Sequence, residues 1–268
     1  MEHNWLDLAI DKKLKSFVIF NRFNTKTENY NEMTKMKKIL AILASVMATA
    51  SLVEASELSV SGTFAWESEY IFRGVRLADE YFAPSIDVSY GDFYAGIWAA
   101  LPVEGTKWDG TDQNEVDYYA GYGLGLSETI SADFGFTYYT YPEAEEDFFG
   151  DPNTFEIYGG LSFDVPFSPA VYVFYDFDLD ALTLEVSGGH TVELTEESAV
   201  DFSIYLGNVA PDEGSDYVYY GAGVSYSYSL TENASVSIGV NYYGADEAME
   251  ADGSKSKFTW GCSFSAGF

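Results

Sequence analysis

The sequence is poor in cysteine and in basic residues. Its 268 residues include one Cys and two His, and 13 Lys and Arg stand against 43 Asp and Glu, a net charge of -30. A single Cys excludes an intrachain disulfide framework and a cysteine-based zinc site. The shortage of positive charge argues against nucleic-acid binding, because few side chains are left to neutralise phosphates. We therefore expect no cofactor and no nucleic-acid partner.

Long apolar runs are also missing after residue 55, so the sequence predicts no transmembrane helix there. An apolar run at 39–53 follows three lysines and ends in Val53-Glu54-Ala55, which is typical of a secretory signal peptide. A buried helix is the alternative interpretation of this run. We predict that residues 36–55 are the signal peptide and that residues 1–35 are an upstream extension from a mis-assigned start codon. Residues 56–268 are then the mature domain.

Aromatic residues, by contrast, are abundant. The chain has 22 Tyr, 20 Phe and 5 Trp, which together make 18% of it. High net charge with few aromatics would indicate disorder, and this composition excludes that class. Residues 56–268 hold 5 basic and 37 acidic side chains, a net charge of -32. The mature domain is therefore expected to fold despite its charge. The remaining question is whether the folded domain is surrounded by water or by membrane lipid.

Apolar and polar residues alternate with period two along twelve segments of the mature domain. They are 58–69, 82–90, 93–101, 115–126, 130–139, 155–165, 171–178, 182–193, 200–207, 218–228, 235–242 and 258–268. Such segments, even in number, are typical of bacterial outer-membrane barrels, whose closure satisfies every backbone hydrogen bond in lipid. Tight and long connections alternate between the segments, except near 179–181, as periplasmic turns and outer loops do. Segment 93–101 is the least decisive, because both of its faces are apolar.

Alternation does not tell which face points outward, and a soluble barrel would place its apolar face inside. The signal peptide, the unequal loops and the Tyr-rich strand ends, which we expect to form interfacial girdles, favour the membrane case. The chain ends in the aromatic Phe268, which resembles the C-terminal assembly signal of outer-membrane barrels. We predict an all-β protein, an antiparallel transmembrane β-barrel of about 12 strands in the outer membrane of a Gram-negative bacterium.

In that barrel the polar faces line the lumen, and they are rich in carboxylates. The candidate pore-lining residues are Glu67, Glu69, Asp87, Glu115, Asp117, Asp133, Glu156, Asp164, Asp176, Asp178, Glu185 and Asp201, together with the basic Arg73 and Lys257. Acidic linings favour cations, because a low-dielectric wall focuses the field of each carboxylate. We predict a porin for passive diffusion of small solutes with a preference for cations. A non-conducting structural or adhesive barrel is the alternative.

Catalytic and metal-binding motifs are weak in this sequence. His190 is the single His of the mature domain, and no Ser nearby completes the arrangement that a lipid hydrolase needs. Asp176, Asp178 and Asp180 have the spacing that opens a calcium loop, but Ala181 takes the place of the required Gly. We predict neither an enzyme nor a metal site.

Several motifs resemble one family of bacterial outer-membrane proteins, the TorF-type porins. They are Tyr70-Ile71-Phe72-Arg73-Gly74-Val75, then residues 87–90, 93–99 and 115–122 in the same order and spacing, and Glu156-Ile157-Tyr158-Gly159. The resemblance implies an outer-membrane β-barrel with a pore role. We expect outer-membrane lipid and lipopolysaccharide, small solutes or cations, and the barrel-assembly machinery as partners.

Overall fold

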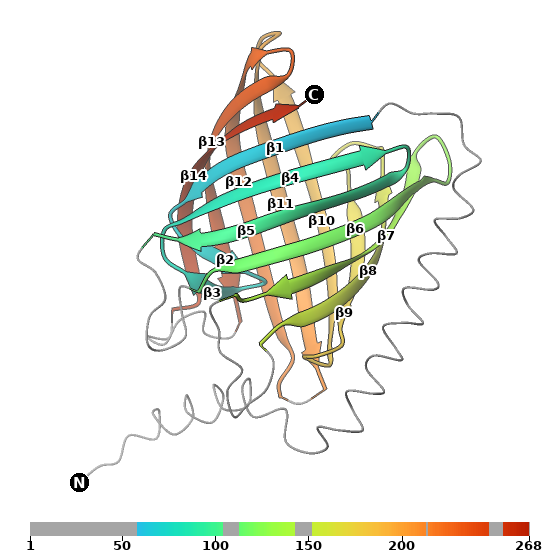
Figure 1. Cartoon of the computed structure of the whole chain (residues 1–268), viewed down its shortest axis with the longest axis vertical. Coiled ribbons are helices and arrows are strands. Elements are labelled where there is room, and N and C mark those ends of the chain that lie inside the picture. Colours follow the sequence, from blue (N-terminus) through green and yellow to red (C-terminus); the bar gives the residue numbers. More distant parts are fainter. Residues whose placement is uncertain (1–57, 104–112, 143–151, 213, 247–253, 268) are drawn as a thin grey trace. The chain divides into compact units, whose positions relative to one another are not determined.

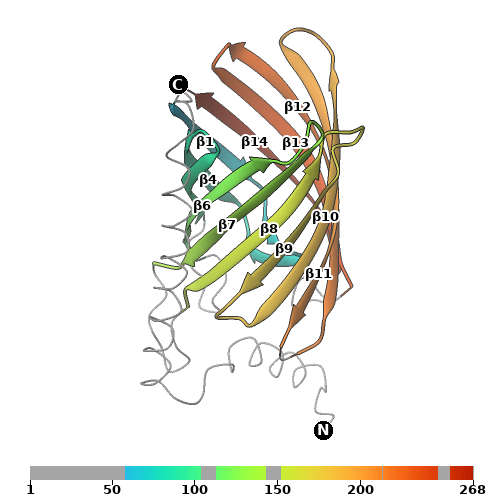
Figure 2. The ribbon, with the colours of Figure 1, turned by 90° about the vertical axis from the view of Figure 1, so that its right-hand side faces the viewer.

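Strands make up the regular structure of the described part of the chain. The computed structural model describes residues 58–103, 113–142, 152–212, 214–246 and 254–267, and within them it contains fourteen strands and no helix. Twelve strands form a closed barrel in the order β1-β14-β13-β12-β11-β10-β9-β8-β7-β6-β5-β4 (Figures 1 and 2). Each neighbouring pair in this ring is antiparallel. The predicted all-β barrel is therefore confirmed.

The observed strands follow the predicted alternation. The barrel strands are β1 (Leu58–Glu67), β4 (Tyr81–Tyr90), β5 (Phe93–Pro102), β6 (Glu115–Gly125), β7 (Ile130–Thr140), β8 (Thr154–Phe163), β9 (Ala170–Asp176), β10 (Ala181–Glu193), β11 (Ser198–Pro211), β12 (Tyr217–Thr231), β13 (Ala234–Ala245) and β14 (Ser256–Gly267). No helix in the described ranges is long and apolar enough to cross a membrane. The predicted signal peptide, the upstream extension and Phe268 lie outside the described residues.

The connections sort to the two ends of the barrel. Tight turns follow β4, β6, β8, β10 and β12, and the start of β1 lies at the same end, where Ser61 pairs with Gly267 near the end of β14. Figure 1 shows the end of β14 on this side of the barrel, which we call the turn end. The longer connections lie at the other end, called the loop end, where one exception, residues 177–180, is short as predicted.

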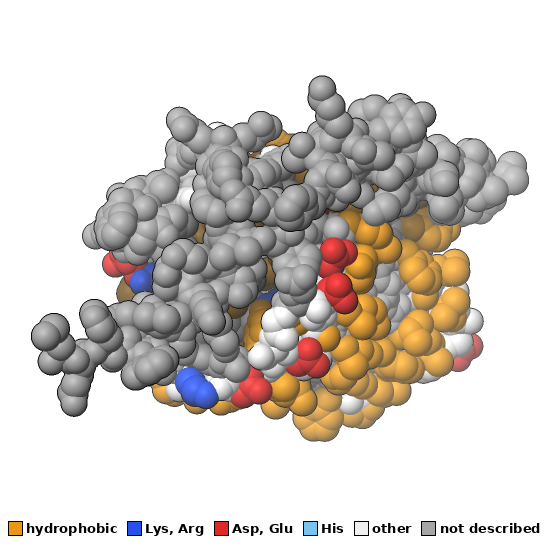
Figure 3. All heavy atoms as spheres, turned by 90° about the horizontal axis from the view of Figure 1, so that it is seen from below, with side chains coloured by type: hydrophobic (Ala, Val, Ile, Leu, Met, Phe, Trp, Pro, Cys, Tyr) orange, Lys and Arg blue, Asp and Glu red, His pale blue; other side chains and the backbone are white. Residues whose placement is uncertain are grey.

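The outer face of the barrel is apolar. Within the described barrel strands, no outward-facing position is Asp, Glu, Lys or Arg, and outward side chains such as Ile86, Ile204 and Phe258 are more than half exposed. Figure 3 shows hydrophobic side chains in orange over the flank of the barrel that is in view. A soluble barrel has its apolar face inside, whereas a membrane barrel has it outside. The structure thus has the membrane arrangement.

A second, two-stranded sheet lies inside the barrel. Its strands are β2 (Tyr70–Phe72) and β3 (Val75–Ala78), which form an antiparallel hairpin in the connection between β1 and β4. Figure 1 shows this β2–β3 hairpin toward the loop end. The sequence prediction treated residues 73–81 as a long outer loop and gave no strand there. The hairpin contacts inward side chains from strands on opposite sides of the ring, which only the interior allows.

The hairpin explains why β5 is apolar on both faces. The inner face of β5 carries Trp98 and Ala100, and Ala100 is fully buried. Both pack with Tyr70 of the hairpin, and the Trp98 and Tyr70 ring centroids are 5.4 Å apart. The inner face of this strand is thus part of a hydrophobic core, so it has no need of the polar residues that face water elsewhere.

Candidate functional site

The tip of the hairpin is a two-residue turn formed by Arg73 and Gly74. Phe72 pairs with Val75 across the turn, and the φ angles of Arg73 and Gly74 are 47° and 78°. Positive φ at both positions defines a type I′ turn, which matches the twist of the strands and favours Asn-Gly. A Cβ on Gly74 would come within 2.8 Å of the Tyr219 Cβ on β12, so glycine lets the tip approach the wall.

Arg73 extends from this tip to the far side of the lumen. Its guanidinium donates two hydrogen bonds to the Glu156 carboxylate, with Nη1–Oε2 at 2.5 Å and Nη2–Oε1 at 2.9 Å. The Arg73 Cζ lies 4.4 Å from the ring centroid of Phe174 on β9 and 4.7 Å from that of Phe72. Paired bonds and stacking on aromatic faces are the contacts that guanidinium makes best.

The Arg73–Glu156 ion pair is almost completely removed from water. The side-chain exposure is 14% for Arg73 and 2% for Glu156. Burial by itself would lower the pKa of Arg73, but the hydrogen bond and charge of Glu156 raise the pKa above its ordinary value. Tyr139 donates a further hydrogen bond of 3.1 Å to Glu156 Oε1. Removing one partner of such a pair leaves an uncompensated buried charge.

Two hydrophobic clusters join the hairpin to the barrel wall. On one side, Tyr70 and Ala78 pack with Tyr81, Ala83 and Ala100 of β4 and β5. On the other side, Ile71 packs against a cluster from β10 to β13, which consists of Ala181, Val209, Tyr219 and Ala245. The hairpin therefore contacts opposite walls and crosses the lumen near the loop end.

Four predicted pore-lining carboxylates lie in this half with little exposure to water. Glu115 and Asp117 on β6, Glu156 on β8 and Asp176 on β9 are each at most 7% exposed. Glu115 accepts a hydrogen bond of 3.2 Å from the hydroxyl of Tyr70, so it too holds the hairpin. Asp176 instead accepts backbone N–H bonds in the turn after β9. In this arrangement the four residues do not face open solvent.

Near the turn end, carboxylates lie on the inner wall with tyrosines. Asp133 on β7 accepts hydrogen bonds from Tyr94 at 2.8 Å and from Tyr172 at 3.2 Å. Asp87 on β4 accepts one from Tyr119 of β6. These bonds reach across an intervening strand, so the rings lie along the wall. Among the described residues, the hairpin does not extend into this part of the barrel, and Asp87 and Asp133 are partly exposed there.

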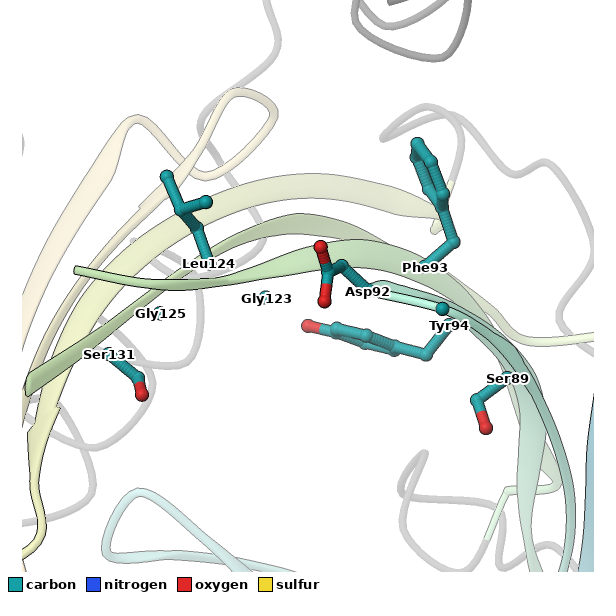
Figure 4. Close-up of a pocket in the computed structure, with 9 residues that line it drawn as sticks. Ser89, Asp92, Phe93, Tyr94, Gly123, Leu124, Gly125 and Ser131 are labelled. Carbon is teal, nitrogen blue, oxygen red and sulfur yellow. The ribbon is translucent and has the colours of Figure 1, made fainter. Parts of the chain in front are cut away.

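Tyr94, Tyr119 and Tyr172, with the carboxylates that they contact, form what we call the tyrosine wall. A shallow concavity opens beside it at Tyr94. Figure 4 shows Tyr94, Ser89 and Ser131 on its inner side, whereas Leu124 and Phe93 point away from the lumen. The inner face of β6 has only glycine at the three positions nearest the turn end, among them Gly121 and Gly125. The tyrosine rings therefore lie next to a wall without side chains.

The other predicted pore-lining residues lie at three kinds of place. Glu185 and Asp201 face the lumen, where Glu185 accepts a hydrogen bond of 2.8 Å from Tyr219 and Asp201 accepts one of 2.7 Å from Thr191. Lys257 of β14 pairs with Glu69 at 2.7 Å beside the hairpin's first strand. Glu67 ends β1, whereas Asp164 and Asp178 lie in connections outside the strands.

Sequence reasoning expected the Tyr-rich strand ends to form membrane girdles and gave the inward tyrosines no role. The tyrosines of the described barrel strands that face the lumen are Tyr81, Tyr94, Tyr119, Tyr139, Tyr158, Tyr172, Tyr205, Tyr217, Tyr219 and Tyr243. The detectable signal is glycine on the adjacent strand: a Cβ on Gly96 would overlap the Tyr119 ring, and one on Gly121 would overlap the Tyr94 ring.

His190 is exposed on the outer face and packs near Phe167, with ring centroids 5.7 Å apart. Among the described residues, no group of three or more His, Cys, Asp or Glu could hold a metal.

Comparison with protein families gives a direct match. Residues 52–261 match the model of a family described as "Bacterial protein of unknown function (Gcw_chp)". The chain belongs to this family. A comparison with the curated proteins finds no match.

Solved structures with a similar fold are porins and channels of the outer membrane. One is "KdgM porin in complex with disordered oligogalacturonate", with a TM-score of 0.51 and 11% identity, covering 78% of this chain and 99% of that one. Another is the COG4313 outer membrane channel from Pseudomonas putida F1, with a TM-score of 0.50 and 7% identity, covering 81% and 97%. At such low identity the likeness establishes the fold, which is that of outer-membrane β-barrel porins.

Proposed function

We propose that this chain forms a passive channel for small solutes across the bacterial outer membrane, with a preference for cations. The observation that carries the proposal is the division of charge between the two faces of a closed barrel. The outer face of the described strands has no charged residue, while carboxylates such as Asp87, Asp133 and Asp201 lie on the inner face. Lipid suits the first face, and hydrated cations suit the second.

The motifs that resemble TorF-type porins, beginning with Tyr70 to Val75, support the same function. We propose that the outer face contacts lipid and lipopolysaccharide and that Phe268 is recognised by the barrel-assembly machinery. The solute of the KdgM complex is not carried over, because oligogalacturonate bears carboxylates that this acidic inner face would repel. We propose no enzymatic activity.

A second candidate, a non-conducting structural or adhesive barrel, is favoured by one observation. The hairpin crosses the lumen between walls that carry Tyr81 and Tyr219. If it never moves and leaves no path beside it, the barrel conducts nothing. The two candidates differ in a property of the purified protein, so one experiment separates them.

The test uses the mature chain refolded into liposomes, with heat-modifiable migration on a gel as the control for a folded barrel. Liposome swelling in isotonic salt and in small neutral solutes measures permeation. The channel proposal expects swelling above protein-free liposomes, faster for smaller solutes. Absence of swelling for the full chain and for a variant without the hairpin would favour the non-conducting barrel.

A further inference from the structure

The β2–β3 hairpin is anchored at both of its ends. At its root, Ser68 accepts a hydrogen bond of 3.0 Å from the Trp260 backbone N–H and donates its own N–H to the Trp260 carbonyl at 2.9 Å. At its tip, Arg73 binds Glu156 of β8, while Phe174 of β9 stacks on the guanidinium. β9 lies halfway round the closed strand order from β1. The hairpin therefore spans the lumen from its root to the opposite wall.

Arginine is a poor residue for the turn that it occupies. A side chain other than that of Asn or Asp is strained at a positive φ and keeps it only where the surrounding structure enforces it. Type I′ turns favour Asn-Gly, so asparagine in place of Arg73 would form this turn with less strain. The arginine is therefore explained by its contact with the wall and not by the turn. Backbone strain that persists at one position suggests a function for that position.

We infer that the β2–β3 hairpin is the constriction that limits which solutes pass, and that Arg73 is the positioning residue that holds it across the lumen through Glu156. This inference rests on the proposed channel function. The chain thus carries its own size filter, in which the wall-bound tip sets the free cross-section near the loop end. Solutes then meet the hairpin at this end and the acidic tyrosine wall at the turn end.

The barrel closes without the hairpin, which makes a clean deletion feasible. Glu67 at the end of β1 pairs directly with Tyr81 at the start of β4. A two-residue Asn-Gly turn is enough to join strands in this register. Replacing residues 68–80 by Asn-Gly therefore removes the whole hairpin and leaves every barrel strand in place. We call this variant the shortened barrel.

The experiment compares single-channel conductance in planar bilayers for the full chain, the shortened barrel, Arg73→Asn, Glu156→Gln and Arg76→Gln. Arg73→Asn suits the type I′ turn better and removes the ion pair with Glu156. If Arg73 served only to form the turn, this variant would therefore conduct no more than the full chain. Arg76→Gln is the matched control, because it removes the same charge from the same hairpin, where Arg76 pairs with Asp79. We expect the shortened barrel, Arg73→Asn and Glu156→Gln to conduct more than the full chain and to admit larger neutral polymers. Arg76→Gln should behave as the full chain does.

A second measurement does not depend on conduction. Ile71→Cys in a Cys262→Ser background places one thiol where the hairpin packs against the far wall. Labelling by a charged maleimide reports how often the hairpin leaves that wall. Adding Glu156→Gln should speed labelling by about a hundredfold or more, since breaking a buried ion pair costs about 3 kcal/mol or more and 1.4 kcal/mol is a tenfold change.

The outcomes separate this inference from the channel proposal. Equal conductance and size limit in the shortened barrel and the full chain would overturn the constriction. Increased conductance in the shortened barrel alone, with Arg73→Asn and the labelling rate unchanged, would overturn the role of Arg73. If no variant conducts, the channel proposal fails. In that case, faster labelling in Glu156→Gln would still support Arg73 as the residue that holds the hairpin.

Discussion

Three inward glycines of β6, Gly121, Gly123 and Gly125, form what we call the glycine row. Substitutions in this row test how side chains pack on the lumen wall. In Gly121→Ala, the new Cβ would overlap the ring of Tyr94, which lies flat against this part of the wall. In Gly125→Ala, on the same strand and the same face, the new Cβ meets no described heavy atom within 4 Å. The two substitutions add the same methyl group, so their difference isolates the contact with the ring.

The magnitude follows from the two ways in which the overlap can be relieved. If the ring stays, overpacking costs about 1–3 kcal/mol. If the ring leaves the wall, Tyr94 loses its 2.8 Å bond to Asp133, worth about 1.5–3 kcal/mol for a charged acceptor. The molecule takes the cheaper route, and replacing a strand glycine returns about 0.5–1 kcal/mol. We expect Gly121→Ala to destabilise the barrel by about 1–2 kcal/mol and Gly125→Ala to stabilise it slightly.

Urea unfolding in lipid vesicles, followed by tryptophan fluorescence and by heat-modifiable migration, measures both free energies. The double variant Gly121→Ala with Tyr94→Ala completes a cycle, in which the alanine should cost nothing once the ring is gone. Equal stabilities of Gly121→Ala and Gly125→Ala, or a coupling energy near zero in the cycle, would refute the packing of Tyr94 on the glycine row.

Three further predictions test the faces and the hairpin. Ile204→Arg puts a charge on the outer face of β11, where Ile204 is 64% exposed. It should lower the free energy of unfolding in lipid vesicles by about 2–4 kcal/mol, the cost of an arginine that faces lipid near the bilayer midplane. Ser203→Arg points inward and should lower this free energy less, and the reverse order would contradict the face assignment. Asp133→Asn keeps the shape of the side chain and should move the reversal potential in a salt gradient toward zero, while Tyr94→Phe should leave its sign unchanged. Gly74→Ala adds a Cβ 2.8 Å from the Tyr219 Cβ at a φ of 78°, so it should displace the hairpin tip and raise the conductance, which an unchanged single-channel current would disprove.

The twelve barrel strands were predictable because each carries a local signal. Period-two alternation is written in every segment, and the unequal connections repeat it at a larger scale. The segment of β5 was ambiguous for a physical reason, since its inner residues Trp98 and Ala100 belong to a core with the hairpin. A pattern rule that expects water on one face cannot describe a strand covered on both.

The hairpin and the tyrosine wall could not be predicted in the same way. Phe72-Arg73-Gly74-Val75 carries the turn, but Arg73 meets Glu156 only because the barrel brings β8 opposite β1. In the same way, Tyr94 meets Gly121 only through the pairing of β5 with β6. Both contacts depend on register between distant segments, whereas alternation reports only the faces of one strand. The sequence identified the candidate carboxylates by residue type and strand face. Only the structure shows that those near the loop end, such as Glu115 and Glu156, are buried, whereas Asp87 and Asp133 near the turn end are partly exposed.

The most direct test of the central claim is the reversal potential of the refolded full chain and of the shortened barrel in a potassium chloride gradient. An acidic inner wall around an aqueous path predicts conductance steps in the shortened barrel at least, with a reversal potential directed toward the potassium equilibrium value. The full chain should have the same sign wherever it conducts. A reversal potential directed toward chloride, or no steps in either protein, would contradict the account.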